Sequence, residues 1–137
     1  MMSVHKHVGT LYESMFKVEA MKRGLHVSEA EGDYLPYDVI IDNGRRLYKV
    51  QVKGTSSRRS KTGYNISTAM GSKTSEKNHY ADKAYDILAA LVVGDGESYW
   101  YIIPKEKIGR NLTIKLFPNP MSKAKWEKYR HGWELIC

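Results

Sequence analysis

The chain has 137 residues, with 22 Lys and Arg against 15 Asp and Glu, so its net charge is +7 and its pI is about 9.4. This length predicts a single domain spanning residues 1–137. The single cysteine, Cys137, excludes an intrachain disulfide framework and a cysteine-based zinc cluster. The longest apolar run, residues 87–93, is far shorter than the roughly 20 residues of a membrane helix. We therefore expect a soluble, intracellular, cytoplasmic protein.

Hydrophobic periodicity divides the chain into helical and extended segments. Apolar residues recur every three or four positions between residues 5 and 23, which predicts an amphipathic helix that ends at Gly24. Asn43-Gly44 predicts a hairpin turn between two strands. Further helices are expected at 74–86, 105–108 and 122–129, and strands at 25–30, 37–42, 46–53, 64–70, 87–93, 98–103 and 112–117. The order predicts an α/β (α+β) fold with a central mixed sheet flanked by helices.

The positive charge is concentrated in one quarter of the chain. Residues 43–75 contain eight Lys and Arg and no Asp or Glu, whereas the other 104 residues contain 14 cations and 15 anions. Such a segment would gain from a polyanion by releasing counterions from phosphates, although a solvated basic loop without a partner would have the same composition. We expect the segment to hold a nucleic-acid backbone through Arg58, Arg59, Lys61 and Lys73.

A group of polar residues on the predicted hairpin could carry chemistry. Alternation along a strand puts Gln51 and Lys53 on one face and the neighbouring valines on the other. Asp38, on the preceding strand, would lie beside them. A carboxylate, an amide oxygen and an ammonium group brought together can bind Mg²⁺ and a phosphate. A metal in this position polarises a phosphodiester, and the lysine can orient or deprotonate the attacking water.

These residues resemble the motif of the PD-(D/E)XK nuclease superfamily. Pro36-Tyr37-Asp38 is followed thirteen positions later by Gln51-Val52-Lys53, and Gly9 and Glu13 lie on the first predicted helix. The Gly-x-x-x-Glu spacing is similar to that of archaeal-type Holliday junction resolvases and group I intron-associated homing endonucleases, over roughly residues 8–104. The resemblance implies a restriction-endonuclease-like core, a magnesium-dependent endodeoxyribonuclease in which Mn²⁺ can replace Mg²⁺, and a phage or an intron as possible origin.

The resemblance also implies a role for each motif residue. Asp38 would be the principal metal ligand, with Glu13, the Gln51 amide oxygen and the Val52 carbonyl as further ligands. Lys53 would attend the nucleophilic water. Gln51 departs from the general motif, which has Asp or Glu there. An uncharged ligand should lower the metal affinity, and the intron-encoded branch is understood to use Gln at this position.

Several alternatives remain open at this stage. Glu19 competes with Glu13 as the helix carboxylate, and Gln51 with Lys53 could be the exposed face of an edge strand. A homing-type endonuclease competes with a junction resolvase, and a catalytically inactive DNA-binding module is possible because of Gln51. Cutting two strands needs two active centres, so we expect a homodimer or higher homo-oligomer.

Overall fold

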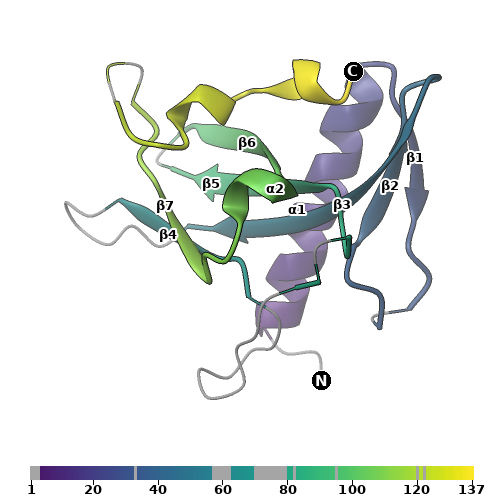
Figure 1. Ribbon diagram of the computed structural model, residues 1–137, viewed down its shortest axis with the longest axis horizontal. Helices are drawn as coiled ribbons and strands as arrows, with labels where there is room; N and C mark the ends of the chain where they lie inside the picture. Colours follow the sequence, from purple (N-terminus) through teal and green to yellow (C-terminus); the bar gives the residue numbers. More distant parts are fainter. Residues whose placement is uncertain are drawn as a thin grey trace.

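The computed structural model describes residues 4–32, 34–56, 63–69, 80–81, 83–94, 96–119, 121 and 123–137. Five strands form the central sheet, in the order β1-β2-β3-β5-β6. Their bounds are His26–Glu29, Val39–Asp42, Leu47–Thr55, Ile87–Val93 and Ser98–Pro104. β3 and β5 pair in parallel and the other neighbours are antiparallel, so the expected mixed sheet is confirmed. Helix α1, Val4–Lys22, crosses one face of this sheet (Figure 1).

The helix ends where its sequence predicts. Gly24 has a φ of +78°, its N–H donates to the Met21 carbonyl at 3.0 Å, and the Leu25 N–H donates to the Ala20 carbonyl at 3.1 Å. This pair of bonds is the Schellman arrangement, which satisfies carbonyls of the last turn and favours glycine in the left-handed position. The buried side chains Phe16 and Ala20 then anchor α1 on the sheet.

The hairpin between β2 and β3 forms at Asn43-Gly44, as predicted. Gly44 has a φ of +89°, and the Asn43 Oδ1 accepts hydrogen bonds from the N–H groups of Arg45 and Arg46, each at 2.9 Å. The register places Val39 opposite Val50. Because β2 begins at Val39 whereas β3 continues to Thr55, the second half of β3 extends beyond its antiparallel neighbour. The candidate site lies beside this second half of β3, which has no antiparallel partner in β2.

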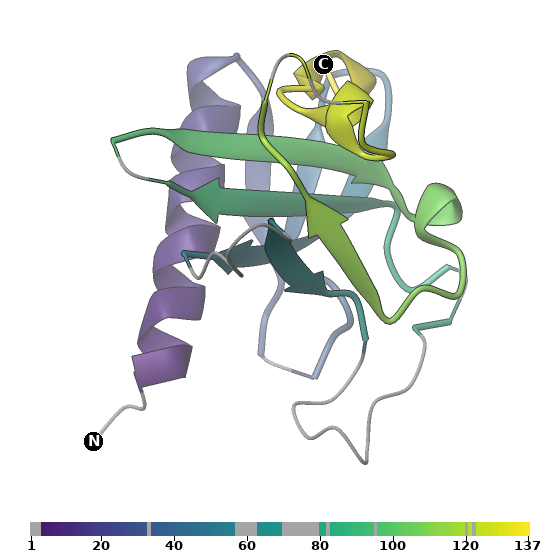
Figure 2. The ribbon, with the colours of Figure 1, turned by 90° about the vertical axis from the view of Figure 1, so that its left-hand side faces the viewer.

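Strand β5 is covered on both faces, which confirms the prediction from its continuous apolar run. Ile87, Ala89 and Leu91 pack in the core under α1. Leu88 and Ala90 belong to the core on the opposite face. That second core is closed by a separate two-stranded sheet of β4, Tyr64–Ser67, and β7, Thr113–Leu116, together with the C-terminal segment (Figure 2).

Two predicted helices are wrong in the parts that the structure describes. Residues 80–81 and 83–86, at the end of the predicted helix 74–86, are not helical and include only a turn at 83 and bends at 84 and 86. The N–H of Asp86 donates to the Lys49 carbonyl at 2.8 Å, so this segment is already joining β3 and cannot continue a helix. Residues 74–79 lie outside the described ranges.

The C-terminal segment shows the second difference. Instead of a helix near 122–129 there are two 3₁₀ turns, η3 at Glu127–Tyr129 and η4 at Trp133–Leu135. Trp126 and Tyr129, three residues apart, are buried in one core, and a 3₁₀ turn aligns such positions. The short helix α2, Lys105–Ile108, is confirmed. Among the helices described, none is long and apolar enough to cross a membrane.

Candidate active site

The predicted catalytic residues meet in one groove beside β3, where this strand extends beyond β2. Glu13 reaches it from α1, Asp38 from the residue before β2, and Gln51, Val52 and Lys53 from β3. The groove has a volume of about 550 Å³. This is enough for a small group such as a phosphodiester with its sugars. Residues separated by up to 40 positions in the sequence therefore line one surface.

Asp38 is held by the backbone and side chains of β3. Its N–H donates to the Val50 carbonyl at 2.9 Å. Its carboxylate oxygen Oδ2 accepts hydrogen bonds from the Val52 N–H at 2.8 Å and from the Gln51 Nε2 at 3.0 Å. Three contacts with one strand fix the direction of the carboxylate into the groove.

The half-buried Glu13 carboxyl lies beside Asp38. Burial, then the hydrogen bond and the negative charge of Asp38, together raise the pKa of Glu13 from its usual 4.5 to about 7, against an opposing effect of Lys17. Two neighbouring carboxyl groups resist simultaneous ionisation unless a cation joins them. A raised pKa of this kind is typical of functional sites.

Lys53 faces the same groove and is half-buried. Burial lowers the pKa of its ammonium group, and the negative charge of Asp38 offsets part of that effect. A lysine with a lowered pKa releases its proton more readily, which favours a role in proton transfer. Its position on β3, two residues after Gln51, confirms the predicted shared face of these two side chains.

The oxygen atoms around the groove fit a hard divalent cation. Glu13 and Asp38 supply carboxylates and Gln51 an amide oxygen. The backbone carbonyl of Val52 is a further candidate ligand. Val52 lies two residues after Val50, which is the partner of the first residue of β2, so the Val52 carbonyl is on the side of β3 that β2 leaves open. With the Gln51 Nε2 toward Asp38, the amide would have to turn for its oxygen to share a cation with that carboxylate. In the described ranges no group of three or more His, Cys, Asp and Glu could hold a metal, so a cation here depends on amide and backbone oxygens.

A contact that the sequence did not predict sets the position of α1 relative to the site. A Cβ atom at Gly54 would lie 2.7 Å from the Tyr12 Cε2, so only glycine permits the ring to pack on β3. Because Tyr12 precedes Glu13, this contact places the helix carboxyl at the groove. Tyr80 is also near: burial raises the pKa of its hydroxyl, and the charge of Asp38 adds to this.

The structure decides two of the alternatives. Glu19 pairs with Arg23 at 2.8 Å and Lys22 at 3.4 Å and does not line the groove. β3 lies between β2 and β5, and Gln51 is 8% exposed, so the edge-strand interpretation is wrong. The predicted DNA-binding residues Arg58, Arg59, Lys61 and Lys73 lie outside the described residues.

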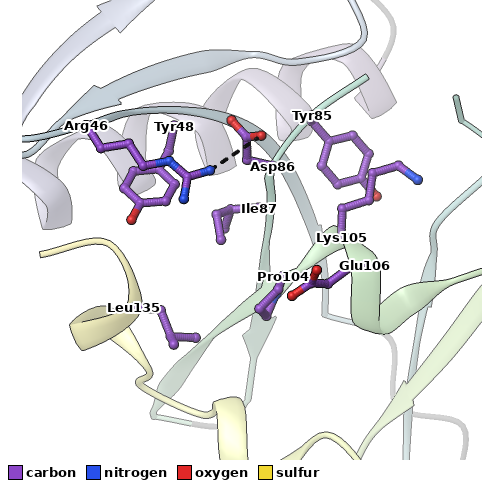
Figure 3. Close-up of a pocket in the computed structure, with 9 residues that line it drawn as sticks. All are labelled: Arg46, Tyr48, Tyr85, Asp86, Ile87, Pro104, Lys105, Glu106 and Leu135. Atoms are coloured by element: carbon purple, nitrogen blue, oxygen red, sulfur yellow. Dashed lines mark ion pairs between the residues drawn. The ribbon is translucent and has the colours of Figure 1, made fainter. Parts of the chain in front are cut away.

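A second pocket, of about 320 Å³, lies around the starts of β3 and β5 and the end of β6 (Figure 3). Arg46 stacks over Tyr48 at 4.3 Å and is 3.9 Å from the Asp86 carboxylate. The other carboxylate oxygen of Asp86 accepts the Lys49 N–H at 2.8 Å. Asp86 thus links the starts of β3 and β5. Both oxygens of its carboxylate already have partners, so we interpret its role in this pocket as structural.

Nearly the whole chain matches one known protein family. A model of the PD-(D/E)XK endonuclease family matches residues 3–136, and the chain belongs to that family. It is accordingly a DNA endonuclease, as the sequence predicted. No curated protein matches the chain.

Solved structures share the fold. A bacterial homing endonuclease, I-Ssp6803I, is 24% identical with a TM-score of 0.84, and the match covers 98% of this chain and 93% of that one. MepB is 15% identical with a TM-score of 0.52, covering 87% and 95% of the two chains. Hjc, a Holliday junction resolvase from the archaeal hyperthermophile Archaeoglobus fulgidus, is 16% identical with a TM-score of 0.50, covering 78% and 83%. The restriction-endonuclease-like fold is thereby confirmed.

Proposed function

We propose that this endonuclease is magnesium-dependent and of the homing type, with Glu13, Asp38, Gln51 and Lys53 as its catalytic residues. The observation that carries the proposal is the contact of two carboxyl groups, Glu13 and Asp38, in the groove that Lys53 also lines. The pKa of about 7 at Glu13 indicates that burial and Asp38 disfavour its ionised form, which a divalent cation would stabilise. Gln51 in place of an acid is consistent with the intron-encoded branch.

The residues would divide the reaction between them. Glu13, Asp38, Gln51 and the Val52 carbonyl would hold Mg²⁺, or Mn²⁺ in its place. The cation would polarise the scissile phosphodiester and lower the pKa of the attacking water. Lys53 would accept the proton of that water as its oxygen attacks phosphorus. The bond from phosphorus to the 3′-oxygen then breaks, which leaves a 5′-phosphate and, after protonation by solvent, a 3′-hydroxyl.

DNA would be held beside this groove by the basic segment. Arg58, Arg59, Lys61 and Lys73 follow β3 or lie further along the same acid-free segment, and they would contact phosphates without reading bases. One groove cuts one strand, so cleavage of a duplex would use a homodimer or higher homo-oligomer with two such grooves.

The decisive experiment compares the wild type with Lys53→Ala on plasmid and oligonucleotide DNA in Mg²⁺, in Mn²⁺ and in EDTA. Wild type should cut only with metal, and Lys53→Ala should lose at least about 100-fold in rate while still binding DNA. Lys107→Ala, an exposed lysine of α2, removes the same charge away from the groove and should cut normally. Equal inertness of wild type and Lys53→Ala, with both binding DNA, would leave an inactive DNA-binding module.

A junction resolvase is the second candidate, because the fold is shared with Hjc. A panel of linear duplex, nicked duplex and four-way-junction DNA separates the two roles. A homing-type enzyme should cut a particular long duplex sequence. Cleavage of junctions of any sequence, with linear duplex intact, would assign the resolvase role instead.

A further inference from the structure

Gly9 is an unfavourable residue for its place in the fold. It lies in the helical interior of α1, the sixth residue of Val4–Lys22, and its φ is not positive. Glycine is the poorest helix former after proline, and alanine the best. At Gly54 the Tyr12 ring explains the missing side chain, but a Cβ at Gly9 would meet no atom within 4 Å. Contacts among the described residues therefore give no reason for glycine at this position.

The surroundings of Gly9 point to the reason. Gly9 lies one helical turn before Glu13. It precedes Phe16 by seven residues and Ala20 by eleven, so it is on the side of α1 that packs against the sheet. The first turns of α1 extend beyond the sheet (Figures 1 and 2). Gly9 is therefore exposed, although the same side of α1 is buried further along the helix. Together with Lys53 it lines the groove.

The groove wall near Gly9 matches the chemistry of a nucleic-acid backbone. Val4, Val8 and Tyr12 offer apolar surface on the helix side, and Ser56 and Lys53 offer a hydroxyl and an amine on the strand side. A deoxyribose presents apolar carbons and a phosphodiester presents anionic oxygens, so the two sides complement the two parts of one nucleotide. Glycine permits a close approach of ligand to backbone that any side chain prevents.

We propose that the sugar–phosphate backbone of the cleaved DNA strand passes over Gly9 and makes its closest approach to α1 there, one turn from the metal-binding carboxylates. This inference rests on the proposed function, because it places the substrate of the same groove. A second copy of the chain packed on Gly9 is the competing occupant. DNA is favoured because a substrate must enter the groove that contains Glu13, Asp38 and Lys53.

The test is the series Gly9→Ala and Gly9→Leu, with His7→Ala as the matched control. His7 is exposed in the same turn of α1 and does not line the groove, so its replacement raises helix propensity without adding atoms to the wall. Gly9→Ala should raise Tm by about 2–4 °C, because a helical backbone and open space favour alanine. It should nevertheless slow cleavage by at least about 10-fold, with Gly9→Leu slower still. His7→Ala should raise Tm and cut normally.

Further measurements separate the possible outcomes. Mn²⁺ affinity by calorimetry should be unchanged in both Gly9 variants, whereas their Kd for DNA should rise. Gly9 variants that cut and bind DNA like wild type would overturn the inference while leaving the nuclease intact, and so would a Gly9→Ala protein that is less stable. A lower oligomeric state in sedimentation, with DNA affinity per subunit retained, would assign Gly9 to the subunit interface. A wild type that cuts no DNA would overturn the proposed function, and this inference with it.

Discussion

Replacing Glu13 by glutamine should stabilise the metal-free protein while abolishing its activity. The pKa of Glu13 is about 7 in the folded chain and 4.5 as its usual value. A difference of about 2.5 corresponds to about 3.4 kcal/mol at 1.36 kcal/mol per pKa unit. Glu13 is half-buried, so solvent screening reduces the expected effect to about 1–2 kcal/mol. Glutamine keeps the size and polarity of the side chain and removes the charge that opposes Asp38.

The sign of the effect follows from proton binding. Between pH 4.5 and 7 the folded chain binds the Glu13 proton more tightly than the unfolded chain does, so stability falls as the pH rises through this window. Glu13→Gln should therefore match wild type near pH 4.5 and exceed it by about 1–2 kcal/mol at pH 8. A divalent cation should reverse the order, because it stabilises the wild-type pair of carboxylates and has one ligand fewer in the variant.

Urea unfolding followed by tryptophan fluorescence, in EDTA from pH 4.5 to 8.5, measures this difference. Glu19→Gln is the control of opposite sign on the same helix, because the hydrogen bond from Arg23 lowers the pKa of Glu19. That variant should be less stable than wild type at pH 8 and approach it as the pH falls. A Glu13→Gln effect that is independent of pH, or absent at pH 8, would refute the account of two repelling carboxylates.

Three further outcomes are expected. Gly54→Ala should cost about 1–3 kcal/mol in urea unfolding and slow cleavage, because the added Cβ displaces Tyr12 and with it Glu13; unchanged stability would contradict this packing. Tyr101→Phe should cost about 1.5–3 kcal/mol through its part-buried 2.9 Å hydrogen bond to Glu127, whereas Tyr99→Phe, at an exposed hydrogen bond to Glu97, should cost little; equal costs would show that burial does not set the cost. Arg58→Ala with Arg59→Ala should weaken binding to all DNA sequences and lower the slope of log K against log salt by about 2; an unchanged slope would remove this segment from the interface.

Local patterns accounted for most of the elements. The spacing of apolar residues and Gly24 predicted α1 and its end, Asn43-Gly44 predicted the hairpin, and the continuous apolar run predicted β5. These features depend on neighbours within a few residues, so they can be read from sequence. The segment before β5 could not, because Asp86 takes its partners from Lys49, 37 residues earlier, and these bonds override any local helical tendency.

The family motif, the order of the strands and the shared face of Gln51 and Lys53 could be predicted from the sequence, because they follow from residue identity and from the period of a strand. The meeting of Glu13, rather than Glu19, with Asp38 could not be predicted in this way, because the rotation of α1 depends on the Tyr12 contact with Gly54. The groove itself exists because β3 continues beyond the start of β2. The spacing of residues determines on which face of a helix or strand a side chain lies. Long-range packing determines which faces meet, and therefore how strongly the carboxyl groups on them shift each other's pKa.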